Sequence, residues 1–210
     1  MILVLDTATR TPVVALAAPD GTILAERHWE SRHRHGEELL ARLDEVLAEA
    51  GTTRRALTGV VVGTGPGSFT GLRIGLATAK TIAYALSVPI CGISSTRALA
   101  LAAANADPGA NKVTIALPAG AADRYVHSFR IVDGLPIEAK PPALTATPPK
   151  ADERDGQAIS GLAAALARLG AESLRAGATD DPATLVPAYV ALPRGIAAAA
   201  AEMTWSPDLR

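Results

Sequence analysis

The N-terminal region alternates between apolar runs and turn signals. Apolar or alternating runs cover residues 2–6, 13–18 and 22–29, and Pro19-Asp20-Gly21 separates the last two. Runs of this length are typical of strands, and the Pro-Asp-Gly sequence is a strong turn signal. The pattern predicts a three-stranded antiparallel meander at the N-terminus.

The hydrophobic period then changes from that of strands to that of helices. Leucine, valine and alanine recur at helical spacing in residues 35–50, and Gly51 ends this stretch. Strand-like and helical stretches alternate after it, which is typical of a parallel α/β sheet. In chain order we expect a strand at 58–63, a glycine-rich loop at 63–71, a helix at 72–86, a strand at 89–93 and a capped helix from 94–96 to 104.

The signals beyond residue 105 are weaker, and they predict a second, shorter lobe. The expected elements are strands at 113–117 and 124–132, a surface loop at 141–156, a short strand at 157–160, a helix at 162–176, an extended tail from 180 and an alanine-rich end at 195–210. We therefore divide the chain into an N-terminal lobe, residues 1–104, and a C-terminal lobe, residues 105–210.

Composition and charge narrow the class of protein. The chain of 210 residues is 49% hydrophobic and 20% charged, a globular composition, with a formal net charge of −1 and 3% aromatic residues. A free-standing nucleic-acid binder normally carries excess positive charge and aromatic platforms, so this class is disfavoured. Basic residues do cluster locally, and any RNA contact is expected at Arg27, Arg32, Arg34, Arg54 and Arg55.

Cysteine and apolar content indicate the compartment. Cys91 is the single cysteine, which excludes an internal disulfide or a multi-cysteine metal site, and its apolar surroundings predict a buried thiol. The sequence shows neither a signal peptide nor an apolar run of the ~20 residues that span a membrane. We therefore expect a cytoplasmic protein without a membrane partner.

The histidines do not form a metal-binding pattern. His28, His33 and His35 are interleaved with arginines, which would repel a cation, and they lack the spacing of a helical ligand pair. We expect no metal site here.

The glycine-rich segment 63–75 carries the most informative motif, GTGPGSFTGLRIG. A dinucleotide fingerprint fails because Ser68 holds the third glycine position. A G-x-S-x-G nucleophile elbow around Ser68 fails because Pro66 and Thr70 hold its two glycine positions. A GxxxxGK[ST] phosphate loop fails because Ala79 precedes Lys80-Thr81. Two interpretations stay open: a well-capped strand-to-helix connection, or an anion or partner site at a helix N-terminus.

Small residues recur every four positions along the helix that follows. Gly71, Gly75, Ala79 and Ala83 form a ridge on one helix face, which lets another element approach closely. The approaching element is either a helix of the same chain or a second subunit. Arg73 lies beside this ridge, where a polar contact at its rim is expected.

A carboxylate at the end of the first strand is the remaining candidate for chemistry. Asp6 begins the sequence Asp6-Thr7-Ala8-Thr9, and the matching hairpin of actin-, sugar-kinase- and Hsp70-type ATPases reads D-x-G-x-T. The β-carbon of Ala8 should hinder the approach of a phosphate. The weak candidates for nucleotide contact are Asp6, Thr7, Gly65 and Ser68.

Three segments together resemble the TsaB (YeaZ) family, the non-catalytic paralogue of TsaD/Kae1. They are MILVLDTATR at 1–10, the helix from His35, and GTGPGSFTGLRIGLATAK at 63–80, with a weaker P-x-Y match at Pro187-Ala188-Tyr189. The resemblance implies an α/β, two-lobed actin/Hsp70-type (ASKHA, ribonuclease H-like) fold. The family's D-A-R-x-G-E-x-Y stretch is poorly kept at 117–125, which indicates an eroded, short C-terminal lobe.

The same resemblance implies a function. It is that of a non-catalytic assembly subunit in the synthesis of N6-threonylcarbamoyladenosine at position 37 of tRNA. The implied partners are a TsaD-like transferase, a TsaE-like ATPase, a second copy when the chain is alone, and tRNA indirectly, with ATP or ADP only at the interface of the complex. The implied interface residues are Leu39, Leu43, Ser68, Phe69, Gly71, Arg73, Gly75, Ala79 and Ala83.

One alternative function is kept. A weak ATPase or a sugar-kinase-like phosphotransferase would use the same fold, with Asp6, Thr7 and the 63–71 loop at the nucleotide. A peptidase lacks both a nucleophile and a metal constellation in this sequence.

Overall fold

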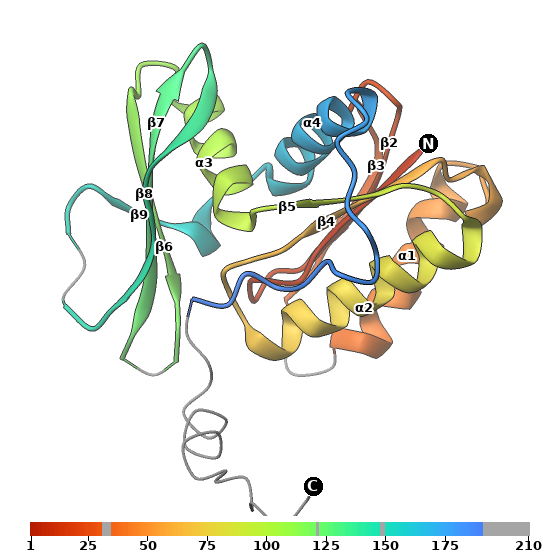
Figure 1. Cartoon of the computed structure of the whole chain (residues 1–210), viewed down its shortest axis with the longest axis horizontal. Coiled ribbons are helices and arrows are strands. Elements are labelled where there is room, and N and C mark those ends of the chain that lie inside the picture. The colour runs from red at the N-terminus through yellow and green to blue at the C-terminus, as the bar shows by residue number, and fades with distance from the viewer. Residues whose placement is uncertain (31–34, 121, 148–149, 191–210) are drawn as a thin grey trace, which may run out of the picture.

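The computed structural model describes residues 1–30, 35–120, 122–147 and 150–190, and the side chains of 35–37 are not described. Within these residues the chain forms two sheets with helix α3 between them (Figure 1). The strands are β1 (Ile2–Asp6), β2 (Val13–Ala17), β3 (Ile23–His28), β4 (Gly59–Gly63), β5 (Ile90–Ile93), β6 (Lys112–Pro118), β7 (Arg124–Val132), β8 (Leu135–Thr145) and β9 (Glu153–Asp155). The helices are α1 (His35–Glu49), α2 (Phe69–Leu86), α3 (Ser95–Ala106) and α4 (Leu162–Arg175), with 3₁₀ turns at Arg54–Ala56 and Gly156–Ala158.

The first sheet has the strand order β3-β2-β1-β4-β5. The first three strands pair antiparallel, which confirms the predicted meander, and β4 and β5 join β1 in parallel. Helices α1 and α2 cover one face of this sheet, and α4 covers the other (Figure 1). This is the predicted α/β, two-lobed actin/Hsp70-type fold.

Strand alternation divides the core into two layers. Leu3 and Leu5 of β1 pack toward α1 and α2, whereas Ile2 and Val4 pack toward α4, because successive side chains of a strand point to opposite faces. Both layers are fully buried, so the sheet is apolar on both sides. This explains why β1 is a continuous hydrophobic run.

The second sheet has the strand order β8-β7-β6-β9, and α3 packs against one of its faces. The prediction of a surface loop at 141–156 is wrong at both ends, because β8 continues to Thr145 and β9 covers Glu153–Asp155. Strand β8 is an edge strand, where Pro141 and Pro142 are tolerated. The prediction of a strand at 157–160 is wrong, because residues 157–158 belong to the 3₁₀ turn Gly156–Ala158 and residues 159–160 have no regular structure.

After the last strand of the second sheet, the chain packs again on the first sheet. Helix α4 packs on β1, β4 and β5, and residue Asp180 bridges to Ile90 of β5. The lobe boundary at residues 104 and 105 therefore separates the two sheets, but α4 and the segment after it belong to the body of the first. The alanine-rich end at 195–210 lies outside the described residues. In the described part of the chain, no helix has the length and apolarity that crossing a membrane requires.

A substitution at Gly170 tests how closely α4 packs on the first sheet. A β-carbon at Gly170 would lie 2.2 Å from Cγ2 of Val61 in β4, so Gly170→Val should overpack this contact and lower the free energy of unfolding by about 1–3 kcal/mol. Urea denaturation measures this loss. Ala164→Val, at an exposed position of the same helix, is the control. An equal effect of both changes would contradict the close docking of α4.

Candidate functional site

The glycine-rich loop packs directly on the turn that follows β1. The backbone amide of Ser68 donates to the carbonyl of Ala8 at 2.7 Å, and the hydroxyl of Thr7 donates to the carbonyl of Gly71 at 2.7 Å. A β-carbon at Gly67 would lie 2.3 Å from the Ala8 oxygen, and one at Gly71 would lie 2.1 Å from the Thr7 oxygen. Glycine is required at both positions because two backbones approach this closely.

Ser68 caps the helix that begins after this loop. Its side-chain oxygen accepts a hydrogen bond from the backbone amide of Gly71 at 3.2 Å. This confirms the predicted cap at Ser68 and satisfies one of the free amides of the first turn of α2.

Asp6 is held inside the protein by its own chain. The carboxylate is fully buried and accepts hydrogen bonds from Ser95 Oγ at 2.5 Å and from the Ala8 amide at 2.7 Å. Burial raises the pKa of this carboxyl, while the two hydrogen bonds act in the opposite direction. A β-carbon at Gly63 would lie 1.7 Å from the carboxylate.

The weak nucleotide candidates therefore do not form a nucleotide site in this structure. Asp6, Thr7 and Gly65 are buried, and each is hydrogen-bonded within the chain. Ser68 is exposed, but its side chain serves as the helix cap. The glycine-rich loop packs on the hairpin, and the polar groups of the hairpin are already hydrogen-bonded within the chain, so these residues do not fit a phosphate group.

The ridge of small residues on α2 faces inward. Gly71, Gly75, Ala79 and Ala83 are all buried, and a β-carbon at Gly75 would lie 2.2 Å from the Thr7 hydroxyl oxygen. The ridge packs on Thr7 and on strand β4 of the same chain, so the approaching element is neither a helix nor a second subunit, and the expectation that the ridge is a contact surface for a second subunit is corrected. Leu39 and Leu43 of α1 are likewise buried, in the core under α1 and α2.

The remaining predicted interface residues lie on the opposite, outer side of α2. Arg73 is exposed, and its guanidinium carbon lies 4.0 Å from the ring centroid of Phe69. The ring of Tyr189 packs on Phe69 with centroids 5.1 Å apart, and Arg73 Nε donates to the Tyr189 hydroxyl at 3.0 Å. Phe69, Arg73 and Tyr189 thus form one cluster, which we call the aromatic–arginine cluster.

Tyr189 reaches this cluster on a segment that we call the C-terminal strap, residues 178–190. The strap runs beside β5 and α2 in Figure 1. Gly92 donates to the Asp180 carboxylate at 2.7 Å, Lys80 Nζ donates to the Leu185 carbonyl at 3.1 Å, and the Ala188 amide donates to Thr64 at 2.8 Å. The strap covers the edge of the first sheet and fixes the position of Tyr189.

Exposed apolar side chains continue along this side of the molecule. Tyr84 of α2 is 82% exposed and Val186 of the strap is 65% exposed. Tyrosine, phenylalanine and arginine are among the residues enriched in protein–protein interfaces, and tyrosine and arginine are also enriched in their hot spots. The outer side of α2, together with the strap, therefore has the composition of a protein-binding surface.

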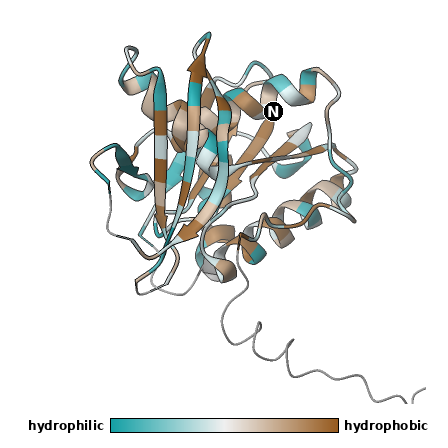
Figure 2. Cartoon of the chain, turned by 60° about the vertical axis from the view of Figure 1, so that its left-hand side comes forward, coloured by the Kyte–Doolittle hydropathy of each residue, from teal (hydrophilic) through white to brown (hydrophobic). Residues whose placement is uncertain are grey.

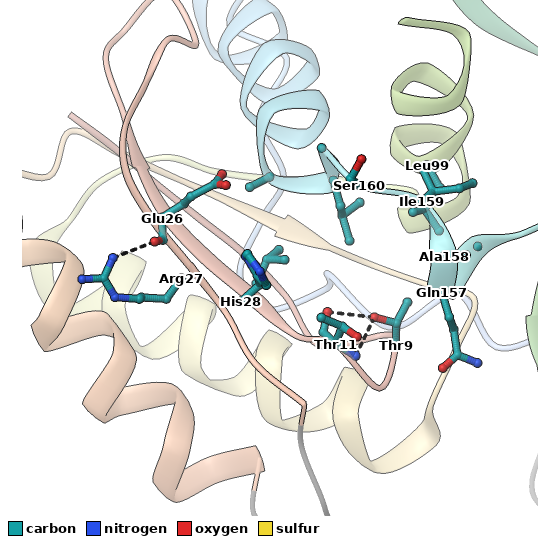
Figure 3. Close-up of a pocket in the computed structure, with 15 residues that line it drawn as sticks. Thr9, Thr11, Glu26, Arg27, His28, Leu99, Gln157, Ala158, Ile159 and Ser160 are labelled. Carbon is teal, nitrogen blue, oxygen red and sulfur yellow. Dashed lines mark hydrogen bonds between the residues drawn. The ribbon is translucent and has the colours of Figure 1, made fainter. Parts of the chain in front are cut away.

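A cavity of about 280 Å³ lies between the β1–β2 turn, β3 and the start of α4 (Figure 3). The hydroxyl of Thr9 is used by the backbone of Thr11, to which it is bonded in both directions. Glu26 and His28 offer one acidic and one imidazole group, while Arg27 points away toward α1. The predicted nucleotide candidates do not line this cavity, and its charges favour no single class of ligand.

Two residues of the predicted basic cluster, Arg27 and Arg54, are paired with acidic residues of α1. Arg27 pairs with Glu45 at 3.2 Å and with Glu49 at 2.5 Å, and Arg54 pairs with Asp44 at 2.5 Å. Arg32 and Arg34 lie outside the described residues, as does His33. Among the described residues no group of histidine, cysteine, aspartate or glutamate forms a metal site.

Sequence reasoning missed a buried histidine that joins the second sheet to α3. His127 Nδ1 lies 2.7 Å from the Thr96 hydroxyl, and His127 Nε2 lies 2.9 Å from the Glu138 carboxylate. Burial lowers the pKa of this imidazole, while Glu138 acts in the opposite direction. The pairing of β7 with β8 and the packing of α3 on that sheet bring these groups together, so no local pattern could have indicated them.

Comparisons with known proteins show which proteins this chain is similar to. The family model of the tRNA N6-adenosine threonylcarbamoyltransferase TsaD matches residues 22–147. The tRNA threonylcarbamoyladenosine biosynthesis protein TsaB of Escherichia coli is 36% identical over 125 residues, which are 59% of this chain and 52% of that protein. An uncharacterized protein of Mycobacterium leprae is 40% identical over 102 residues, 47% of this chain and 28% of that protein. The chain thus spans about half the length, or less, of these curated relatives.

A solved structure agrees with the fold. YeaZ from Pseudomonas aeruginosa superposes with a TM-score of 0.76 and 23% identity, and the match covers 90% of this chain and 98% of that one. At this identity the likeness concerns the fold alone.

The cap at Ser68 gives a test of the loop geometry. Ser68→Ala should lower the free energy of unfolding by about 0.5–2 kcal/mol, because the Gly71 amide loses its acceptor. Thermal or urea unfolding measures the loss. Thr70→Ala, which changes the neighbouring exposed hydroxyl, should leave stability within about 0.5 kcal/mol. The reverse order of effects would show that the cap is assigned to the wrong residue.

Proposed function

Because this chain belongs to the TsaB (YeaZ) family, we propose that it is a non-catalytic assembly subunit in the synthesis of N6-threonylcarbamoyladenosine in tRNA. Its role is to bind and support a TsaD-like transferase. A TsaE-like ATPase joins this complex, and the chain pairs with a second copy when the transferase is absent.

The observation that carries this proposal is the aromatic–arginine cluster on the outer side of α2. Phe69, Arg73 and Tyr189 contact one another there, and each presents part of its surface to solvent. The ring contacts and the hydrogen bond restrict the side chains before a partner arrives, which reduces the entropy lost on binding. Such a preorganised cluster of aromatic and arginine side chains suits a protein partner better than a small molecule.

The hairpin after β1 supports an assembly role. In an ATPase on this fold, the carboxylate and the turn would need to face a nucleotide. Here the Asp6 carboxylate is bonded to Ser95, and the hydroxyl of Thr7 is bonded to Gly71. The groups that would serve chemistry are used instead to dock α2 and α3.

Ala77 is the position at which to test partner binding. It is exposed on α2, whereas Gly75 and Ala79 are buried and their replacement by arginine would disturb the core. Ala77→Arg adds a bulky charge to the outer side and should abolish or strongly weaken co-elution with the TsaD-like protein in size-exclusion chromatography. Circular dichroism should show an unchanged fold.

Ala164→Arg is the matched control for this experiment. It adds the same side chain at an exposed position of α4, on the opposite face of the first sheet. The control should keep the complex and its ability to form threonylcarbamoyladenosine. If Ala77→Arg also keeps both, the outer side of α2 is not the binding surface.

The alternative of a weak ATPase or phosphotransferase has its own test. The isolated chain should show no tight binding of Mg·ATP in isothermal titration calorimetry, because the hairpin groups are already hydrogen-bonded within the chain. A one-to-one isotherm with a dissociation constant in the micromolar range would favour the enzyme.

A further inference from the structure

Among the residues that the structure describes, no helix covers one face of the second sheet. Helix α3 packs against its inner face, and Figure 2 shows the opposite face turned toward the viewer with no described helix across it. Val113 and Ile115 of β6 and Phe129 of β7 point inward and are buried. Because side chains alternate along a strand, Lys112 and Arg130 belong to the outer face.

Strand register gathers positive charge on this outer face. Lys112 of β6 lies directly opposite Arg130 of β7, and Lys140 of β8 lies opposite Ser128, two positions before Arg130. Neighbouring strands are about 4.8 Å apart and alternate residues about 7 Å apart, so the three cations lie within roughly 12 Å of one another in backbone position. We call Lys112, Arg130 and Lys140 the basic face.

Most of this charge is not compensated within the described chain. Neither Arg130 nor Lys140 forms an ion pair there, and Lys112 has only an exposed contact of 3.4 Å with Asp152. Exposed pairs of this kind contribute little. The other charged pair on this face joins Arg124 and Glu153. Both side chains are nearly buried, and their charges neutralise each other.

The juxtaposition of Lys112 and Arg130 is unfavourable for the free chain. Like charges directly opposite one another in an antiparallel pair destabilise a sheet. A ligand with several closely spaced negative charges would relieve this repulsion, whereas a single acidic side chain would meet only one of the cations. The face presents no aromatic ring for base stacking, since Tyr125 and Phe129 share the inward register of His127.

We propose that the basic face contacts the phosphate backbone of tRNA in the assembled complex. This inference rests on the proposed function, since it names an RNA surface of the same assembly. The contacts would be electrostatic and independent of base sequence, because they reach phosphates and not base edges. They would add to the binding by the transferase.

The salt dependence of tRNA binding tests the proposal. The probe is an unmodified tRNA transcript, titrated in a fluorescence anisotropy assay with the complex of the full chain and the TsaD-like protein over a series of salt concentrations. Each phosphate contact that is removed should reduce the slope of log affinity against log salt by about 1. Arg130→Gln with Lys140→Gln should therefore weaken binding and flatten the slope by about 2.

Arg168→Gln is the matched control, since Arg168 is an exposed cation on α4, away from the second sheet. It should leave the affinity and the slope unchanged. Size-exclusion chromatography should show that the double variant still binds the TsaD-like protein. An unchanged slope with an intact complex overturns the inference and leaves the proposed function standing.

Two further outcomes are decisive. If the double variant loses the TsaD-like protein while tRNA binding by the remaining components is unaffected, the face binds protein and the RNA assignment is wrong. If the wild-type chain forms no complex, the proposed function fails, and the same variants are compared for the chain alone with the transcript at low salt. A difference there supports the RNA contact, and equal binding overturns it.

Discussion

The close approach of α2 to the turn after β1 is the constraint on which the rest of the first lobe depends. The hydroxyl of Thr7 bonds the carbonyl of Gly71, and a side chain at Gly67, Gly71 or Gly75 would collide with the turn. This approach engages the Thr7 hydroxyl and the Ala8 carbonyl in hydrogen bonds within the chain. It also decides which side of α2 is left for a partner, because the small residues pack on Thr7 and β4.

The same turn is connected to the second sheet through two neighbouring residues of α3. The hydroxyl of Ser95 donates a hydrogen bond to the carboxylate of Asp6, at the end of β1 in the first sheet. The hydroxyl of Thr96 is hydrogen-bonded to the imidazole of His127 in the second sheet. Both hydroxyls and the imidazole are buried, so an unpaired group among them would be costly. The start of α3 therefore fixes the orientation of the lobes by directional bonds as well as by apolar packing, and this makes the outer face of the second sheet a defined surface.

Much of the fold could be predicted from local patterns, since period and turn chemistry are properties of short segments. Residues 124–132 were predicted as a strand and form β7, and the helix predicted at 162–176 forms α4. The misassigned region at 141–156 shows the limit. Proline and threonine disfavour a strand locally, but pairing with β7 stabilises β8, and Pro141 and Pro142 lie on this edge strand where its register shifts, a position that tolerates proline.

The surfaces could not be predicted, for a related physical reason. Periodicity indicates that Gly71 and Gly75 share a helix face, but it does not say which face of α2 meets the sheet. Net charge and local clusters pointed to Arg27 and Arg54, yet both are paired with acids on α1. Lys112, Arg130 and Lys140, in contrast, lie far apart in sequence and meet only through strand register. An average charge near zero is therefore compatible with a locally basic surface, because folding pairs some cations with neighbouring acids and leaves others facing one another.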